Sequence, residues 1–203
     1  MTNLLEGLSE TPLPGLDRPL TFAEIAMAHK YLKLLIKWQQ SHRLVGSTNY
    51  RWMIENVIID SVAFLTQVPR QAQVIADIGS GAGIPGIPVA VVRPDLQMTL
   101  IESRRRRVSF LLTVVRELGL SGVQVLAARV EDLVESHRDQ FDVLLMRCAG
   151  PAERILESSF GILRSGGVAI LTAKLGSPSV GGQTALVQMP DGRRRQFQCF
   201  TKP

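Results

Sequence analysis

The sequence predicts an α/β fold: a doubly wound parallel sheet that closes with an antiparallel hairpin and is preceded by a small helical lobe. Two observations carry this prediction. From about residue 74 onward, short apolar runs alternate with amphipathic stretches, and each run is nearly continuous, as in strands covered by helices on both faces. Over residues 21–64, in contrast, apolar residues recur at helical spacing.

The N-terminal lobe is expected over residues 1–70. Thr21 is followed three residues later by Glu24, which is the pattern of a capping box and opens a first helix after a lead rich in Pro and Gly. The polar run 46–49 separates this helix from a second one. The segment is therefore expected to be an all-helical N-terminal lobe.

The second unit, residues 71–203, alternates between the two kinds of element. Strands are expected over residues 74–78, 98–101, 123–127, 141–146 and 167–173, and helices over residues 86–92, 104–118, 130–135 and 152–163. Such alternation indicates a parallel sheet with right-handed crossovers. The tail adds runs 185–189 and 194–201 around an Asp-Gly turn, which predicts an antiparallel hairpin at the edge of the sheet.

The bulk composition is that of a soluble globular protein. Of the 203 residues, 45% are hydrophobic and 20% are charged. No apolar run approaches the ~20 residues of a membrane span, and the start has no basic and then apolar leader, so we expect a cytoplasmic protein. Two cysteines, Cys148 and Cys199, stand outside any metal-ligand spacing, which argues against a disulfide framework and a zinc site.

The net charge of +5 comes mostly from arginine, with clusters at residues 104–107 and 193–195. Arginine suits phosphate because its planar fork donates paired hydrogen bonds, so a polyanionic partner is one interpretation. Cations at the start of the predicted helix 104–118 oppose its dipole, and RNA phosphate would compensate for them. The alternative is that Glu102 and solvent are sufficient; the sequence leaves both open.

A glycine-rich turn stands between the first predicted strand and the first helix of the sheet unit. In the run Asp-Ile-Gly-Ser-Gly-Ala-Gly at residues 77–83, the glycines allow positive φ and a close approach of ligand to backbone. Ligands of such sheets bind at the carboxyl ends of the strands. Glu102 ends the next strand, 19 residues after Gly83, where a carboxylate can accept hydrogen bonds from both ribose hydroxyls. Alternatively, Glu102 only caps the following helix.

The spacing of the turn favours S-adenosylmethionine over a dinucleotide. Dinucleotide sites use Gly-x-Gly-x-x-Gly, whereas the last gap here is one residue, and Asp77 precedes Gly79 by two. A carboxylate at this point would repel a pyrophosphate and would suit the amino group and sulfonium of S-adenosylmethionine. Glu131, after the third predicted strand, is placed to meet the adenine amino group. The sequence therefore predicts methyl transfer rather than hydride transfer.

A longer motif resembles one family. The run Gly-Ala-Gly-Ile-Pro-Gly-Ile-Pro at residues 81–88 is similar to that of the RsmG (GidB) family, bacterial methyltransferases that modify N7 of a guanine in small-subunit ribosomal RNA. The resemblance covers roughly residues 31–174, with further matches at residues 31–38, 60–61, 100–103, 106–107, 110–111, 129–131, 141–142 and 146–147. It implies a Rossmann-like class I methyltransferase sheet and makes residues 71–203 the S-adenosylmethionine-binding domain.

The resemblance also implies roles. Gly79 and Ile84 would hold the cofactor in the turn, Glu102 the ribose, Val130 and Glu131 the adenine, and Arg147 would lie beside the transferable methyl. With the residues deduced from the turn itself, the expected cofactor-binding set is Asp77, Gly79, Gly81, Ile84, Glu102, Val130, Glu131 and Arg147. The expected RNA contacts are Arg104, Arg106, Arg107, Arg147 and Lys174, the last because it follows the fifth strand at the same edge of the sheet.

No catalytic acid or base is expected. Guanine N7 has an in-plane lone pair and no proton to lose, so attack on the sulfonium methyl needs placement, which can lower a barrier by ~7–11 kcal/mol. His29, His42 and His137 are scattered through predicted helix or loop and are expected at the surface. The expected partner is small-subunit ribosomal RNA or the 30S subunit, and the protein is expected to be a monomer without a metal.

The sequence departs from the family on the side expected to face RNA. Where the family has Asn-Leu-Thr this chain has residues 43–45 Arg-Leu-Val, and where it has a His this chain has Val57. Where the family has Leu-Lys-Gly, this chain has Ala-Lys-Leu-Gly at residues 173–176, and where the family has Arg-Ala, it has Arg-Cys at residues 147–148. Two alternatives therefore stay open: a methyltransferase of another RNA or of a small molecule, and a non-catalytic, cofactor-binding module associated with RNA.

Overall fold

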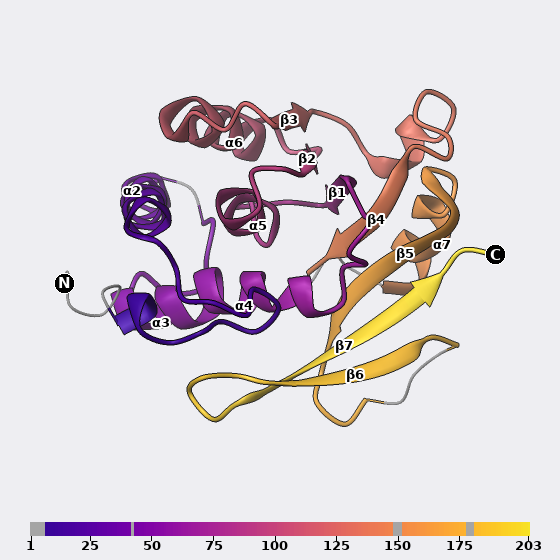
Figure 1. The fold of residues 1–203 in the computed structure, drawn as a ribbon. Helices are drawn as coiled ribbons and strands as arrows, with labels where there is room; N and C mark the ends of the chain where they lie inside the picture. Colours follow the sequence, from indigo (N-terminus) through magenta and orange to yellow (C-terminus); the bar gives the residue numbers. More distant parts are fainter. Residues whose placement is uncertain (1–6, 42, 148–151, 178–180) are drawn as a thin grey trace.

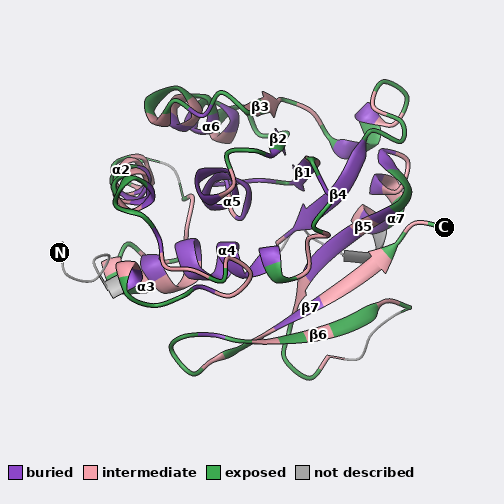
Figure 2. Cartoon of the chain, in the orientation of Figure 1, coloured by how far each residue is buried: buried purple, intermediate pink, exposed green. Residues whose placement is uncertain are grey.

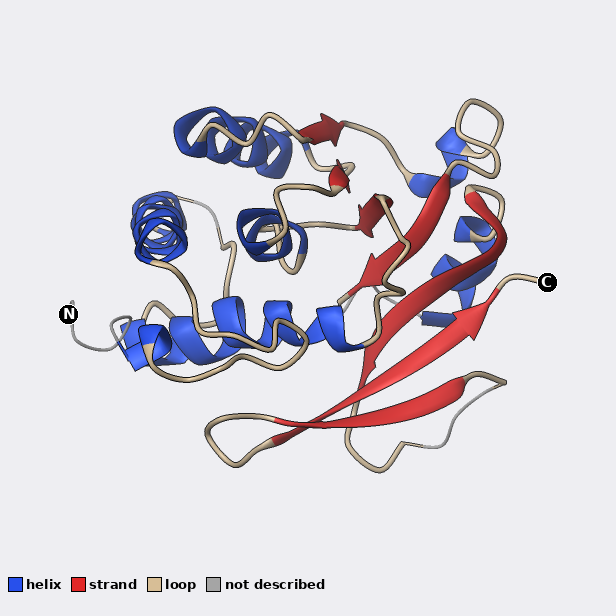
Figure 3. Ribbon diagram, viewed as in Figure 1, coloured by secondary structure: helices blue, strands red, loops and turns tan. Residues whose placement is uncertain are grey.

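A seven-stranded sheet forms the centre of the molecule (Figures 1 and 3). The computed structural model describes residues 7–41, 43–147, 152–177 and 181–203. The strand order is β3-β2-β1-β4-β5-β7-β6, with β1 to β5 parallel and β7 antiparallel to both of its neighbours. The strands are β1 Val74–Ile78, β2 Gln97–Ile101, β3 Val123–Leu126, β4 Phe141–Met146, β5 Leu163–Ala173, β6 Gln183–Gln188 and β7 Arg194–Thr201. The predicted doubly wound sheet and its C-terminal hairpin are confirmed.

The helices cover both faces of the sheet. They are η1 Gly7–Ser9, α2 Phe22–Gln39, α5 Gly86–Val92, α6 Arg105–Leu118, η4 Val130–Leu133 and α7 Ala152–Ser159. A continuous helical run, residues 50–66, is made of α3 Tyr50–Met53, the π-helical turn η2 Ile54–Ile59, α4 Asp60–Val62 and η3 Ala63–Thr66. No helix in the described ranges is long and apolar enough to cross a membrane.

The capping box that the sequence predicts at the start of α2 is present. The Glu24 backbone N–H donates to Thr21 Oγ1, and the Thr21 N–H donates to Glu24 Oε2 at 2.7 Å. The second helix begins similarly, with Asn49 Oδ1 accepting from the Trp52 N–H at 3.0 Å. These caps satisfy N–H groups that a helix start leaves without partners, and they place both helices where the polar runs end.

Two buried clusters lie on opposite faces of the sheet, because successive strand residues point to opposite sides. On β1, Ile75 belongs to the cluster that includes residues of α2, α5, α6 and the run 50–66, whereas Ala76 belongs to the one that includes residues of η4 and α7. Figure 2 shows buried residues in purple along β4, β5 and α5. The N-terminal helices thus share a buried core with the sheet. The division into residues 1–70 and 71–203 stays a prediction.

Several element boundaries differ from the sequence predictions by one or two residues, and three elements differ in a way that has a physical reason. The helix expected over 152–163 ends at Ser159, and β5 begins at Leu163 instead of Gly167. The pairing of β4 with β5 is irregular between Phe141 and Val143. The facing residues at the start of β5 are polar or glycine, so their sequence does not show the apolar pattern of a regular strand. The run 130–135 forms only the short turn η4, since four residues make barely one turn of helix.

Candidate cofactor and RNA site

The glycine turn follows β1 and adopts the conformation that its glycines predict. Gly79, Gly81 and Gly83 have φ of 67°, 58° and 83°, a region that favours glycine. A Cβ at Gly83 would also lie 2.5 Å from Ile87 Cγ1. The turn is fixed to the neighbouring strand because the Ser80 N–H donates to the Ile101 carbonyl at 3.0 Å.

Glu102 follows β2 directly and is 4% exposed. Its Oε2 accepts from the Gly81 N–H at 3.0 Å, and its Oε1 accepts from the Arg104 N–H at 2.8 Å, just before α6. Arg107 Nη1 lies 3.6 Å from Oε2. The carboxylate therefore does cap the start of α6, and it also joins that start to the glycine turn. Each carboxylate oxygen has two lone pairs, so capacity for further donors is left.

Two cavities meet at Gly79. The first, here called the Glu102 cavity, has a volume of about 270 Å³ and is lined by Gly79, Glu102, Arg104, Val130 and Glu131 among others. The second, here called the Arg147 cavity, has about 310 Å³ and is lined by Trp52, Gly79, Gly81, Ile84, Arg107 and Arg147 among others. A still larger cavity, about 440 Å³, lies at the amino ends of β1 to β3, away from the turn. Only the first two cavities adjoin the predicted site.

Most predicted site residues are brought together by these two cavities, and three are not. Asp77, Arg106 and Lys174 line neither of them. Arg106 and Lys174 are exposed, so both remain surface candidates for RNA phosphate. Cys148 and His42 lie outside the described residues, and neither His29 nor His137 lines either cavity.

Asp77 is fully buried behind the turn. Its Oδ2 accepts from the Gly86 N–H at 3.0 Å, which ties β1 to the start of α5. Its Oδ1 has no hydrogen-bond partner among the described residues. Burial raises the pKa of Asp77 to about 7, although the hydrogen bonds from Gly86 and Ser80 oppose the rise. Its predicted contact with the cofactor's amino group stays a prediction, whereas its contact with α5 is part of the fold.

Tyr31 of α2 reaches the turn from the N-terminal part of the chain. It is 1% exposed, and its hydroxyl donates to the Ala82 carbonyl at 2.7 Å. We expect Tyr31→Phe to lower the free energy of unfolding by about 1–2 kcal/mol, because the change removes this bond and leaves a buried carbonyl without its donor. Urea unfolding of both proteins measures the effect; an unchanged midpoint would show that the hydroxyl does not support the turn.

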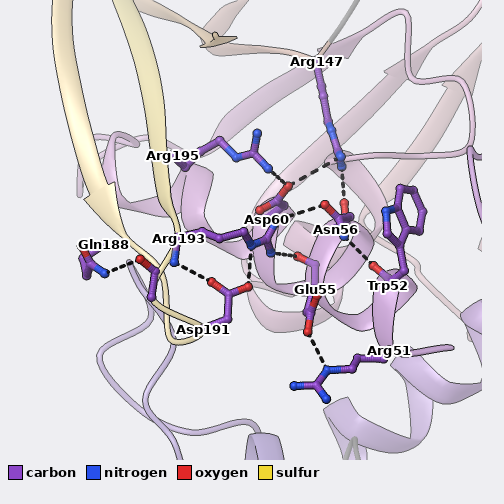
Figure 4. Close-up of polar contacts among 11 residues, drawn as sticks. Arg51, Trp52, Glu55, Asn56, Asp60, Arg147, Gln188, Asp191, Arg193 and Arg195 are labelled. Atoms are coloured by element: carbon purple, nitrogen blue, oxygen red, sulfur yellow. Dashed lines mark hydrogen bonds and ion pairs between the residues drawn. The ribbon is translucent and has the colours of Figure 1, made fainter. Parts of the chain in front are cut away.

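Arg147 follows β4 and is held from the helical run 50–66. Its Nη1 donates to the Asn56 carbonyl at 2.6 Å, and its Nη2 lies 3.7 Å from Asp60 Oδ2 (Figure 4). Burial raises the pKa of Asp60, while the guanidiniums of Arg195, Arg147 and Arg193 oppose this rise. Sequence reasoning did not assign Asn56 or Asp60 to the site. The sequence signal that could have identified Asp60 is that it directly follows the apolar run 57–59 on a helix expected to be buried. A carboxylate at a buried position needs a charged or hydrogen-bonding partner.

Comparison with known proteins identifies the family. The family model described as GidB, rRNA small subunit methyltransferase G, matches residues 24–188. The chain belongs to this family. The ribosomal RNA small subunit methyltransferase G of Trichormus variabilis is 32% identical over 180 residues, which cover 84% of this chain and 73% of that protein. The protein of the same name from Polynucleobacter asymbioticus is 33% identical, covering 81% of this chain and 76% of its own length.

The fold agrees with the GidB assignment. The structure of an S-adenosylmethionine-dependent methyltransferase from Aquifex aeolicus superposes with a TM-score of 0.54 at 14% identity, covering 85% of this chain and 97% of that one. The predicted Rossmann-like class I methyltransferase sheet is therefore confirmed. The cofactor named for that neighbour, S-adenosylmethionine, is the one that the glycine turn predicts for this chain. Within the ranges that the structure describes, no group of three or more His, Cys, Asp or Glu side chains could hold a metal ion.

Two of the departures from the family pattern, at Val45 and Val57, fall in the wall of the Arg147 cavity. Leu44, Val45 and Val57 all line it. Gln39 fixes the loop that carries the first two, since its Oε1 accepts from the Leu44 N–H at 2.7 Å and from the Val45 N–H at 3.0 Å. The changes therefore lie beside the glycine turn, where they make this wall more apolar.

Proposed function

We propose that this chain transfers the methyl group of S-adenosylmethionine to N7 of a guanine in small-subunit ribosomal RNA. The observation that carries the proposal is the pair of cavities meeting at Gly79 in a member of the rRNA small subunit methyltransferase G family. One is lined by Glu102 and Glu131 together with two arginines, and the other by Arg107 and Arg147. The pair is suited to a ligand with a nucleoside at one end and an anionic group at the other.

The residues fit the cofactor chemically. In the Glu102 cavity, the carboxylates of Glu102 and Glu131 suit the ribose hydroxyls and the adenine amino group, beside the apolar wall of Val130. In the Arg147 cavity, Gly81, Ile84 and Arg147 would receive the amino-acid end. When bound, S-adenosylmethionine supplies an electrophilic methyl group.

The chain's own part in the reaction is placement. Guanine N7 attacks with its lone pair and releases no proton, so no side chain has to act as base. Trp52, half-buried in the Arg147 cavity, offers an aromatic face against which a base can stack. Arg107 lies at the same opening, while the exposed Arg104, Arg106 and Lys174 would bind phosphates around it.

The proposal includes a monomer that works without a metal in the cytoplasm, on small-subunit RNA either free or in the 30S subunit. One observation favours a second candidate: Val45 and Val57, which line the Arg147 cavity, stand where the family has Thr and His. An altered wall would suit a different base or RNA, with the same cofactor and the same chemistry.

Methyl mapping on ribosomal RNA tests the proposal. Small subunits and naked RNA from cells that lack this protein are incubated with labelled S-adenosylmethionine and the purified chain, with Glu102→Ala as the matched control. The expected result is one labelled guanine, cleaved by the chemistry specific for N7-methylguanine, with the control unlabelled. Label on another base would favour the second candidate, and label only on a small metabolite would refute the proposal.

A further inference from the structure

A cluster of charged side chains lies against the Arg147 cavity and joins three distant parts of the chain. It is here called the Asp60 cluster and consists of Asn56 and Asp60 from the run 50–66, Arg147 after β4, Arg193 just before β7, and Arg195 within β7 (Figure 4). The family model ends at residue 188, so Arg193 and Arg195 lie beyond the residues that it matches.

Asp60 is the centre of the cluster. It is 2% exposed, and its Oδ2 accepts from Arg195 and lies 3.7 Å from Arg147 Nη2. Its Oδ1 has no hydrogen-bond partner among the described residues. Even a paired buried carboxylate adds little to stability, because the loss of its hydration offsets the attraction to its partners, so stability alone explains this position weakly. Asp60 lies beside Arg147, which lines the cavity, so its position can instead be explained by an effect on that side chain.

The surrounding groups restrict Arg147 from two directions. The Asn56 carbonyl accepts from Nη1 at 2.6 Å, and Asp60 attracts Nη2. Asn56 is itself held, because its Oδ1 accepts from Arg193 at 3.1 Å and its Nδ2 donates to the Trp52 carbonyl at 2.9 Å. The Arg147 guanidinium is thus held in one orientation at the cavity wall, and a planar donor fork depends on orientation for its bonds.

The charges of the cluster are also matched to an anionic ligand. Arg193 pairs with Asp191 at 2.6 Å, and Arg51 pairs with Glu55 at 3.0 Å. Asp60 is then shared between two guanidiniums, those of Arg147 and Arg195. The Arg147 cavity is lined by two guanidiniums, those of Arg107 and Arg147, which would favour an anionic group there.

We propose that Asp60 is a positioning residue of the methyltransferase site, which orients the Arg147 guanidinium into the Arg147 cavity, and that Arg195 makes the C-terminal hairpin part of this arrangement. The ligand of Arg147 in this inference is taken from the proposed function. The way in which Asp60 and Asn56 hold Arg147 does not depend on it. It assigns β7 a role in the site as well as in closing the sheet.

A double-mutant cycle tests the inference. Asp60→Asn, Arg147→Ala and their combination are compared for the Kd of S-adenosylmethionine by calorimetry and for kcat and KM of methyl transfer to small subunits. We expect Arg147→Ala to change the Kd, kcat or KM, and Asp60→Asn to worsen the same constant by roughly 10- to 100-fold, since misplacement of a positioned group has effects of this size. In the Arg147→Ala background, Asp60→Asn should cost nothing further on that constant.

Asp142→Asn is the matched control for burial. Asp142 is 5% exposed, pairs with Arg164 at 2.6 Å and accepts from the Gln73 N–H, but it lies at the opposite end of β4. It should lower the melting temperature without changing the Kd or KM. If Asp60→Asn does not fold, Arg195→Gln replaces it in the cycle with Arg147→Ala, because the Arg195 side chain is partly exposed and pairs with Asp60.

The outcomes separate the inference from the proposed function. Equal losses from Asp60→Asn with and without Arg147, or no effect of Arg147→Ala on either readout, would overturn the inference. An unmutated chain that labels no small-subunit RNA would overturn the proposed function, and the cycle would then be decided by the Kd of the cofactor alone.

Discussion

Glu102→Ala is expected to weaken S-adenosylmethionine binding by about 100-fold or more. Hydrogen bonds to a charged group contribute about 1.5–3 kcal/mol each, and the two ribose hydroxyls would donate two of them to this carboxylate. Since about 1.4 kcal/mol corresponds to tenfold in affinity, their loss gives at least two orders of magnitude. Titration calorimetry with the cofactor measures the change directly.

The same experiment decides between the two readings of Glu102. If the side chain only caps α6 through the Arg104 N–H, Glu102→Ala should lower the melting temperature and leave the Kd unchanged. Glu131→Ala is the control within the same cavity, because Glu131 is exposed and should contribute less to affinity. Glu102→Gln, which keeps one acceptor for the Gly81 N–H, should fall between wild type and Glu102→Ala.

The fold was predictable wherever a local pattern decides the structure. The boundaries of β1, β4 and α5 agree with the sequence predictions because each is an apolar run that ends at a turn or a change of polarity. The start of β5 was missed because residues 164–167 are polar or glycine, and they extend the strand only through an irregularity in its pairing with β4 and through backbone bonds of Gly166 and Gly167 to Lys202. Tertiary context decided there against local preference.

The site was predictable in its cofactor half for a similar reason. The turn at 77–83 and Glu102 are linked by a spacing that the alternation of strands imposes, so a motif locates them. Asp60 and Arg195 are 135 positions apart in the sequence and meet only because β7 returns beside the run 50–66. Nothing local distinguishes Arg195 from its neighbours in the cluster 193–195, so the role of the hairpin required the structure.

Asp77→Asn is expected to remove a pH dependence from the stability of the fold. Burial raises the pKa of Asp77 from 3.8 to about 7, so between these values the folded state keeps a proton that the unfolded chain has lost. The contribution is fully present below pH 3.8 and is lost as the pH rises through about 7. Across this window, the free energy of unfolding should fall by up to about 1.4 kcal/mol per pH unit.

The asparagine variant carries no charge at any pH in this range, and its Oδ1 can still accept from the Gly86 N–H. The amide nitrogen of the variant would occupy the position of wild-type Asp77 Oδ1, which has no partner among the described residues. A buried amide group without an acceptor is unfavourable, so the variant should be less stable than wild type near pH 4. It should overtake wild type toward pH 8, where the wild-type carboxylate is ionised and buried. Urea unfolding at pH 4.5, 6 and 8 checks this; a constant difference between the two proteins would contradict it.

Cofactor binding offers a second test of Asp77, and it bears on the predicted contact with the cofactor's amino group. A cation brought near a buried carboxyl favours the ionised form and lowers its pKa. At pH 6 wild-type Asp77 is largely protonated, so binding should release up to one proton, seen as a calorimetric enthalpy that depends on the ionisation enthalpy of the buffer. Asp77→Asn has no such proton to release. If both proteins give the same buffer dependence, Asp77 does not sense the cofactor's charge, and its role is confined to holding the start of α5 beneath the glycine turn.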